Sequence, residues 1–189
     1  MKINLTANTD LHSVDEFKRL VVREQDEARY REVILRKTAT LFEAGARLGA
    51  IIGDAQPAIQ QAMATYGMHL GLAFQMIDDA LDYGSSDRKI GKNIGDDLAE
   101  GKPTLPLIRA MDQSDPETRA NLRAIIEKGG TERLDEVLAA IESTDAIAYT
   151  ARLATDEAAQ AKQALEALPA SAFRDALMAL ADFSVDRSF

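Results

Sequence analysis

Four polar side chains recur along one face of an apolar helical segment near the middle of the chain. Gln75, Asp78, Asp79 and Asp82 are separated by steps of three, four and seven residues, which return to the same face of an α-helix. Three neighbouring carboxylates repel one another and are costly to remove from water. A hard divalent cation with oxygen ligands relieves both penalties, so this face predicts a Mg²⁺ site.

A solvated face on an ordinary amphipathic helix is the alternative explanation for these carboxylates. Two features of residues 58–83 count against it. The acidic stripe continues into Met68, Gly71 and Leu72, which are not typical of a solvated face, and the segment has almost none of the Lys and Glu that cover exposed helices. A helix that is apolar around most of its girth should lie centrally, so we expect its carboxylates to line an internal cavity.

Lysines in the flanking segments suit the other half of such a site. Lys92 and Lys102 each follow a glycine; glycines let the backbone approach a ligand, and lysines neutralise phosphate. Upstream, Lys37 and Thr38 sit in an otherwise apolar helical stripe, where a lysine is costly unless it reaches an anion. Each lysine alone is more typical of a surface residue with its charged end in water. Together with the acidic stripe, they predict a site for a metal ion and a diphosphate.

Helices are the elements expected to position these residues. Apolar residues recur at helical spacing in nearly every segment, and no alternating pattern predicts a strand. The loop 87–106 is long for a connection, which indicates an ordered and functional segment. The apolar stripe of the last helix is expected to comprise Phe173, Leu177, Leu180 and Phe183. The expected helices cover about 30–50, 58–83 and 106–111, and others begin near Asp115, Thr131, Asp145 and Ser171.

Composition limits the classes of function. The 189 residues are enough for one well-buried domain, and 46% of them are apolar. A net charge of −9 disfavours nucleic acid as a partner. The absence of Cys excludes disulfides and cysteine nucleophiles. No apolar run is long enough to span a bilayer or act as a signal peptide, so the sequence predicts a soluble cytoplasmic protein.

Several spaced motifs resemble one enzyme family. The segment 74–82 has the form F-Q-x-x-D-D-x-x-D and resembles the second aspartate-rich motif of trans-polyprenyl diphosphate synthases. The segments 91–97 and 100–106 resemble the signature of the octaprenyl-type branch, and 37–42 resembles the Lys-Thr helix of the family. The likeness begins near Tyr30. We therefore divide the chain into residues 1–29, an N-terminal segment without a clear match, and residues 30–189, the C-terminal part of a polyprenyl synthase domain.

The resemblance implies an all-α helical bundle of the isoprenoid synthase type, here incomplete. It implies Mg²⁺-dependent prenyl transfer, in which an allylic diphosphate and isopentenyl diphosphate condense to a longer polyprenyl diphosphate. It also implies dimers or larger assemblies of helical subunits. The family's metal ligands correspond to Asp78, Asp79 and Asp82. Its diphosphate-binding residues correspond to Lys37, Thr38, Gln75, Lys92 and Lys102, of which Lys37, Gln75 and Lys92 are the candidate catalytic residues.

The family also requires a first D-D-x-x-D motif followed by arginines, and this sequence contains none. Asp96 and Asp97 form the only other Asp pair and belong to the loop already described. We therefore expect the chain to be inactive by itself. A non-catalytic helical partner of a full-length synthase, and a remnant that binds nothing, are the alternatives. A terpene cyclase fits less well, because residues 101–106 have no counterpart in that class.

Overall fold

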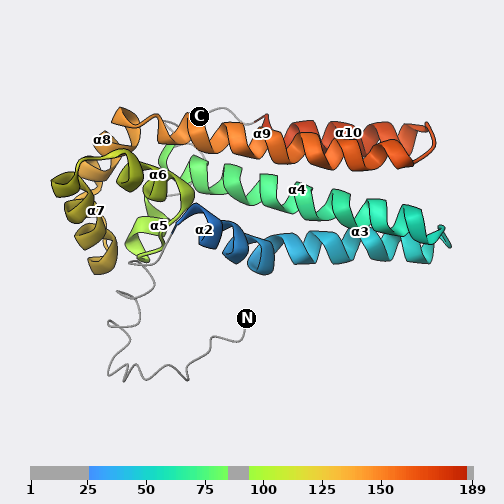
Figure 1. The fold of residues 1–189 in the computed structure, drawn as a ribbon, viewed down its shortest axis with the longest axis horizontal. Helices are drawn as coiled ribbons and strands as arrows, with labels where there is room; N and C mark the ends of the chain where they lie inside the picture. Colours follow the sequence, from blue (N-terminus) through green and yellow to red (C-terminus); the bar gives the residue numbers. More distant parts are fainter. Residues whose placement is uncertain (1–25, 85–93, 187–189) are drawn as a thin grey trace, which may run out of the picture.

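The computed structural model describes residues 26–84 and 94–186 and shows an all-helical fold (Figure 1). Helix α2 (Glu27–Ile34) continues through a π-helical turn (Leu35–Ala39) into α3 (Thr40–Ile52), and the long α4 (Pro57–Gly84) follows. The remaining elements are α5 (Asp96–Ala99), α6 (Leu105–Gln113), α7 (Pro116–Lys128), α8 (Leu134–Ser143), α9 (Ala146–Ala164), a 3-10 turn (Leu165–Ala167) and α10 (Ala172–Val185).

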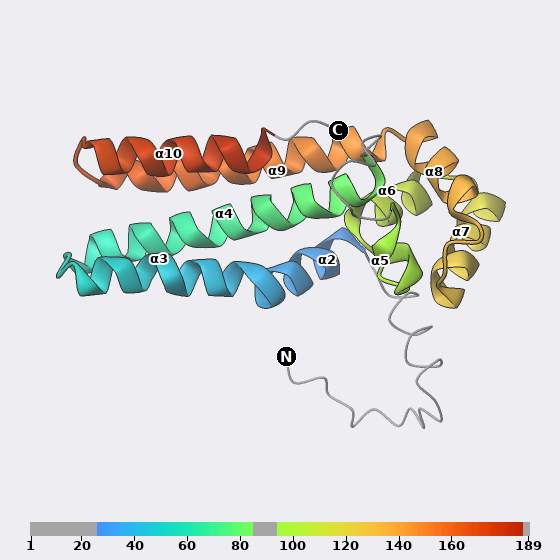
Figure 2. The same ribbon diagram turned by 180° about the vertical axis from the view of Figure 1, so that it is seen from behind.

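The long helices lie side by side, and the short ones gather at one end. Helix α4 packs against both α3 and α9, and α10 packs against α9. Figures 1 and 2 show α5, α6, α7 and α8 clustered at the end of the bundle toward which α2 and the C-terminal end of α4 point. The end of the acidic helix is therefore surrounded by short helices and their connections. None of the helices in the described part of the chain combines the length and apolarity needed to cross a lipid bilayer.

The core consists of two clusters along α4. The larger lies at the end with the short helices and includes Met76 and Ile77, both fully buried. The smaller lies farther along the bundle, where Tyr66 and Leu70 of α4 meet Ala161 and Leu165. Because α4 contributes to both clusters, its position relative to every neighbour is strongly constrained.

Capping residues confirm several helix boundaries expected from the sequence. The carboxylate of Asp115 accepts hydrogen bonds from the backbone N–H groups of Glu117 and Thr118 at 2.9 and 3.0 Å. The hydroxyl of Ser171 caps α10 in the same way, and Gly129 ends α7 with a positive φ of 68°. These three residues bracket helices at the predicted places, because each cap satisfies backbone groups that a helix end leaves unpaired.

Other expectations need correction. Helix α8 begins at Leu134, after the predicted Thr131, whereas α9 begins at Ala146 with the predicted Asp145 as its N-cap residue. The part of the predicted loop that is described contains the one-turn helix α5, and residues 87–93 lie outside the described residues. The predicted apolar stripe of α10 is only partly covered. Leu177 packs against the smaller core cluster, whereas Phe173, Leu180 and Phe183 are exposed, and the buried residues of the helix are Ala181 and Ser184.

Two glycines of α4 let α3 approach closely. A Cβ atom added at Gly67 would clash with the backbone carbonyl of Phe42 and lie 2.9 Å from the Cβ of Ala46. A Cβ at Gly71 would lie 2.7 Å from the Cα of Ala39. Backbone atoms occupy these positions, so they cannot move aside as a flexible side chain would. The close contact between α3 and α4 therefore depends on glycine at both positions.

Replacing Gly67 with alanine should destabilise the protein by about 1–3 kcal/mol, because the gain in helix propensity is outweighed by overpacking against Phe42. Gly45 is the matched control, since a Cβ there would meet nothing within 4 Å. Gly45→Ala should be neutral or more stable by up to about 1 kcal/mol. Urea unfolding measures both variants. A Gly67→Ala protein as stable as the parent would contradict the close packing.

Candidate metal and diphosphate site

Asp79 is the centre of a hydrogen-bond network at the end of α4. Its side chain is only 4% exposed. The phenol of Tyr30 donates to one carboxylate oxygen of Asp79 at 2.7 Å, and the Nε2 amide of Gln75 donates to the other at 2.8 Å. The amide oxygen of Gln75 in turn accepts a hydrogen bond from the hydroxyl of Thr38 at 2.8 Å. Residues far apart in the sequence are thus joined in one line: Thr38, Gln75, Asp79 and Tyr30.

The π-helical turn brings Thr38 to this network. Such wider turns occur mainly as short interruptions of α-helices and often at functional sites. Here the hydroxyl of Thr40 bonds the carbonyl of Leu35 at 2.9 Å across the turn. Because Gly71 has no side chain, the backbone of Ala39 lies directly against α4. This approach places Thr38 within reach of Gln75, which lies one turn farther along α4.

Asp82 anchors the segment that begins at residue 94. One of its carboxylate oxygens accepts a hydrogen bond from the backbone N–H of Asp97 at 3.1 Å, and its carbonyl accepts one from Gly95 at 3.1 Å. Gly95 has a φ of 83°, a conformation that suits glycine because it has no Cβ. The bonds hold α5 against the end of α4, so the carboxylates of Asp96 and Asp97 add negative charge near Asp82.

Burial sets the protonation behaviour of two of the three stripe carboxylates. It raises the pKa of Asp79 from 3.8 to about 6; hydrogen bonds from Tyr30 and Gln75 oppose the rise, and the charges of Asp97 and Asp78 add to it. Burial also raises the pKa of Asp82 from 3.8 to about 6, against the backbone hydrogen bond from Asp97. The hydrogen bonds to both groups therefore compensate only part of the cost of burying their negative charge. A bound cation would compensate the rest.

The lysines are less closely arranged than the sequence predicts. Lys37 is exposed, so the burial cost expected of a lysine in an apolar stripe does not arise. Its charge acts on Glu100, whose pKa is lowered mainly by a hydrogen bond from Lys102. The ammonium group of Lys102 lies 2.6 Å from a carboxylate oxygen of Glu100 and 3.4 Å from one of Asp97. Lys92 lies outside the described residues.

Apart from the lysines, the predicted site residues fall into three groups. Thr38, Gln75 and Asp79 form one network, Asp82 binds the following loop, and Asp78 is half-buried beside them. Sequence reasoning missed the roles of Tyr30 and Asp97. Tyr30 is part of an apolar stripe in the sequence, and only its hydroxyl hinted at a buried polar partner. Nothing in the sequence pattern indicated which carboxylate the backbone of Asp97 would meet.

The donor set suits magnesium chemically, although the carboxylates do not converge on one point. Within residues 26–84 and 94–186, no three His, Cys, Asp or Glu side chains come close enough to hold a metal ion among themselves. Mg²⁺ commonly binds one or two carboxylates and completes its octahedron with water and substrate phosphate oxygens. Asp79 and Asp82 supply hard oxygen donors whose pKa values are raised by burial. The site therefore fits a cation shared with a phosphate ligand.

Comparisons with known proteins show sequence relatives of the chain. The chain is 46% identical over 167 residues to octaprenyl diphosphate synthase of Haemophilus influenzae, covering 88% of this chain and 51% of that protein. It is 44% identical over 162 residues to the Escherichia coli octaprenyl diphosphate synthase, covering 85% of this chain and 50% of that protein. The chain therefore spans about half the length of these curated relatives.

Solved structures resemble the fold over almost the whole chain. A decaprenyl diphosphate synthase from Rhodobacter capsulatus superimposes with a TM-score of 0.82 at 38% identity, covering 93% of this chain and 55% of that one. A polyprenyl synthase from Caulobacter crescentus, complexed with calcium and isoprenyl diphosphate, gives 0.81 at 37% identity and covers 93% of this chain and 57% of that one. The all-helical architecture of the predicted family is thereby confirmed.

The family model for polyprenyl synthetase matches residues 8–144. This range begins within the segment 1–29, for which the motifs alone showed no resemblance, and the division of the chain at residue 29 stays a prediction. The match covers the acidic helix α4, the π-helical turn before it and the helices that surround its end. On this match, and on the relatives that share its sequence and fold, the chain belongs to the polyprenyl synthetase family.

Proposed function

We propose that this chain supplies the part of a trans-prenyltransferase site that binds the diphosphate of an allylic substrate together with Mg²⁺. The observation that carries the proposal is the buried line from Thr38 through Gln75 to Asp79, which joins a predicted diphosphate-binding residue to a predicted metal ligand. A solvated acidic face would not be tied to a second helix in this way. The calcium and isoprenyl diphosphate bound to the Caulobacter crescentus relative support the same ligand classes.

The proposed roles follow the positions of the side chains. Asp78, Asp79 and Asp82 hold the metal through oxygen atoms. Magnesium, when bound, neutralises the diphosphate and stabilises it as a leaving group. Residues that bind or orient the diphosphate are Lys37, Thr38, Gln75, Lys92 and Lys102, and those acting in catalysis are Lys37, Gln75 and Lys92.

The complete reaction would use this half-site for its first step. The bond between the allylic carbon and the diphosphate oxygen breaks, and the electron pair leaves with the diphosphate. The double bond of isopentenyl diphosphate attacks the allylic cation, and a proton is lost to give the longer polyprenyl diphosphate. Water must be kept from the cation. Met68, Gly71 and Leu72 continue the acidic stripe and are candidates for such an apolar wall. Gly71 packs against Ala39 and Leu72 lies in the large core cluster, so only part of this surface is available to line the site.

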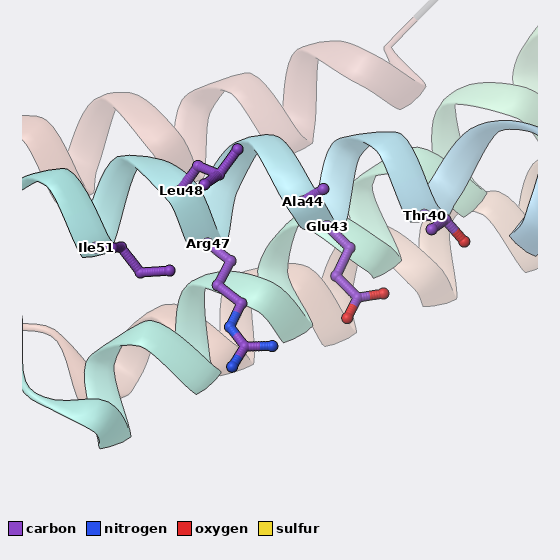
Figure 3. Close-up of a pocket in the computed structure, with 6 residues that line it drawn as sticks. All are labelled: Thr40, Glu43, Ala44, Arg47, Leu48 and Ile51. Carbon is purple, nitrogen blue, oxygen red and sulfur yellow. The ribbon is translucent and has the colours of Figure 1, made fainter.

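A non-catalytic helical partner of a prenyl synthase is the second candidate function, and an exposed apolar surface on α3 is the observation that supports it. Leu41 and Ile52 are 75% and 84% exposed, and Leu48 and Ile51 are about half exposed. Figure 3 shows the pocket on this helix, with Glu43 and Arg47 extending from the same side. Large exposed apolar patches commonly mark association surfaces. We propose that the chain functions in a homo- or hetero-oligomer, and both candidate functions accommodate such a contact.

Mg²⁺ with an allylic diphosphate should raise the melting temperature of the purified chain, because ligands that bind only the folded state stabilise it. Asp78→Ala should remove most of this shift while leaving the fold intact. Asp156→Ala is the matched control, since Asp156 is exposed on α9. Differential scanning fluorimetry measures the shifts. No shift with both ligands at saturation would favour the partner function over the metal–diphosphate site.

Stability should depend on pH with opposite signs in the absence and presence of Mg²⁺. Without metal, the raised pKa of Asp79 means that the folded state binds more protons than the unfolded state between pH 3.8 and about 6. The free energy of unfolding should therefore decrease as the pH rises through this window. The fall attributable to Asp79 is about 3 kcal/mol at most. With subsaturating Mg²⁺ the stabilisation should instead grow over the same window, because the metal needs ionised carboxylates. Urea unfolding from pH 4 to 8, with EDTA or Mg²⁺, tests both signs. Curves that coincide with those of Asp79→Asn would contradict the assignment.

The isolated chain should not elongate isopentenyl diphosphate, because its sequence carries a single aspartate-rich motif of the required form. Radiolabelled isopentenyl diphosphate, an allylic diphosphate and Mg²⁺ provide the assay, with a full-length homologous synthase as the positive control. Labelled product from the pure chain would show that the second motif and its surroundings are sufficient.

A further inference from the structure

Tyr30 is not among the predicted site residues, yet it contacts one of the predicted metal ligands. Its side chain is 3% exposed and belongs to the large core cluster, yet its hydroxyl reaches Asp79 at 2.7 Å. A buried phenol is usually found with a hydrogen-bond partner. Here that partner is a carboxylate of the aspartate-rich stripe, and the bond joins α2 to α4 across 49 positions of the sequence. The contact therefore connects the start of the described chain to the centre of the proposed site.

Helix α2 is held in place from both sides of Tyr30. The carboxylate of Glu27 accepts a hydrogen bond from the phenol of Tyr149 at 2.5 Å. Arg31 pairs with Glu157, which is 5% exposed and also lies 2.7 Å from the Nδ1 of His69. These two partners, both on α9, thus hold both turns of this short helix. Tyr30 lies between these two contacts, so its hydroxyl has little freedom to leave Asp79.

The two donors to Asp79 fix the direction of its carboxylate. Tyr30 and Gln75 each occupy one oxygen, and each oxygen of a carboxylate has a second lone pair that can face a metal ion. Groups that orient a ligating carboxylate in this way commonly change metal affinity by 10- to 100-fold when removed. Gln75 also accepts a hydrogen bond from the hydroxyl of Thr38, so the orientation of Asp79 affects the position of Thr38 as well. Loss of the phenol would therefore loosen both the metal ligand and a diphosphate-binding residue.

We propose that Tyr30 is a positioning residue of this site, which holds Asp79, and through Gln75 also Thr38, in the orientation that binds a metal–diphosphate complex. The inference rests on the proposed function, since it needs the site to bind such a complex. It adds a residue outside the aspartate-rich and Lys-Thr motifs. It also gives α2 a role beyond packing.

Tyr30→Phe tests the role, because it removes one oxygen atom and keeps the ring in the core. Isothermal titration calorimetry of inorganic pyrophosphate in the presence of Mg²⁺ should show binding weakened roughly 10- to 100-fold. Tyr149→Phe is the matched control: it removes the phenol that bonds Glu27 on the same helix, away from Asp79. That variant keeps the Arg31–Glu157 pair that holds α2, so it should bind like the parent even where its melting temperature falls as much.

The outcomes separate the two proposals. A parent chain that binds no pyrophosphate with Mg²⁺ overturns the proposed function and the role of Tyr30 with it. A parent that binds, together with a Tyr30→Phe variant of equal affinity, overturns only the role of Tyr30. Equal weakening in Tyr149→Phe assigns the effect to the placement of α2 and also overturns it. In an Asp79→Asn background, Tyr30→Phe should cause no further loss, since its effect acts through that carboxylate.

Discussion

Uncompensated carboxylate charge at the end of α4 is the constraint on which the rest of the site depends. Asp79 and Asp82 lie where their ionised forms are poorly solvated, and the pKa of each rises to about 6. Their hydrogen-bond donors in the described part of the chain are a phenol, an amide and backbone N–H groups. Such donors orient a carboxylate but supply no formal positive charge, so much of the cost of burial remains. A divalent cation would remove that cost, which is the physical support for the proposed metal site.

The opposite side of α4 allows the protein to tolerate this cost. Met76, Ile77 and Ala80 are completely buried on the side that faces the core, and burial of large apolar side chains contributes roughly 1.5–3 kcal/mol each. The helix is therefore anchored by its apolar side at the level of the carboxylates. Farther along, Gly67 and Gly71 bring α3 close enough for the π-helical turn to meet α4. Packing on two sides thus determines where the acidic side points.

The fold and the acidic helix could be predicted from local patterns, whereas most of the site's contacts could not. Periodicity and flanking Gly and Pro residues located α4 to within one residue at each end. Caps such as Asp115 act over three residues, so their signal is present in the sequence. The bond between Tyr30 and Asp79 joins positions 49 apart, and no local pattern encodes it. Three residues of the predicted α10 stripe are exposed for a related reason. Periodicity identifies the apolar side of a helix but not whether the described chain covers that side.

The charge around the stripe also determines how its proposed ligands must bind. Lys102 is paired with Glu100 and lies near Asp97, and Lys37 is exposed, so neither fully neutralises Asp79. A bare diphosphate approaching this group of carboxylates would be repelled, and a bare cation would find no three carboxylates gathered to hold it among the residues that the structure describes. Each ligand supplies what the other lacks, because the phosphate oxygens complete the metal's coordination and the metal cancels the repulsion. The affinities of the two ligands must then be coupled reciprocally, so the proposed site binds a metal–diphosphate complex more tightly than it binds either component alone.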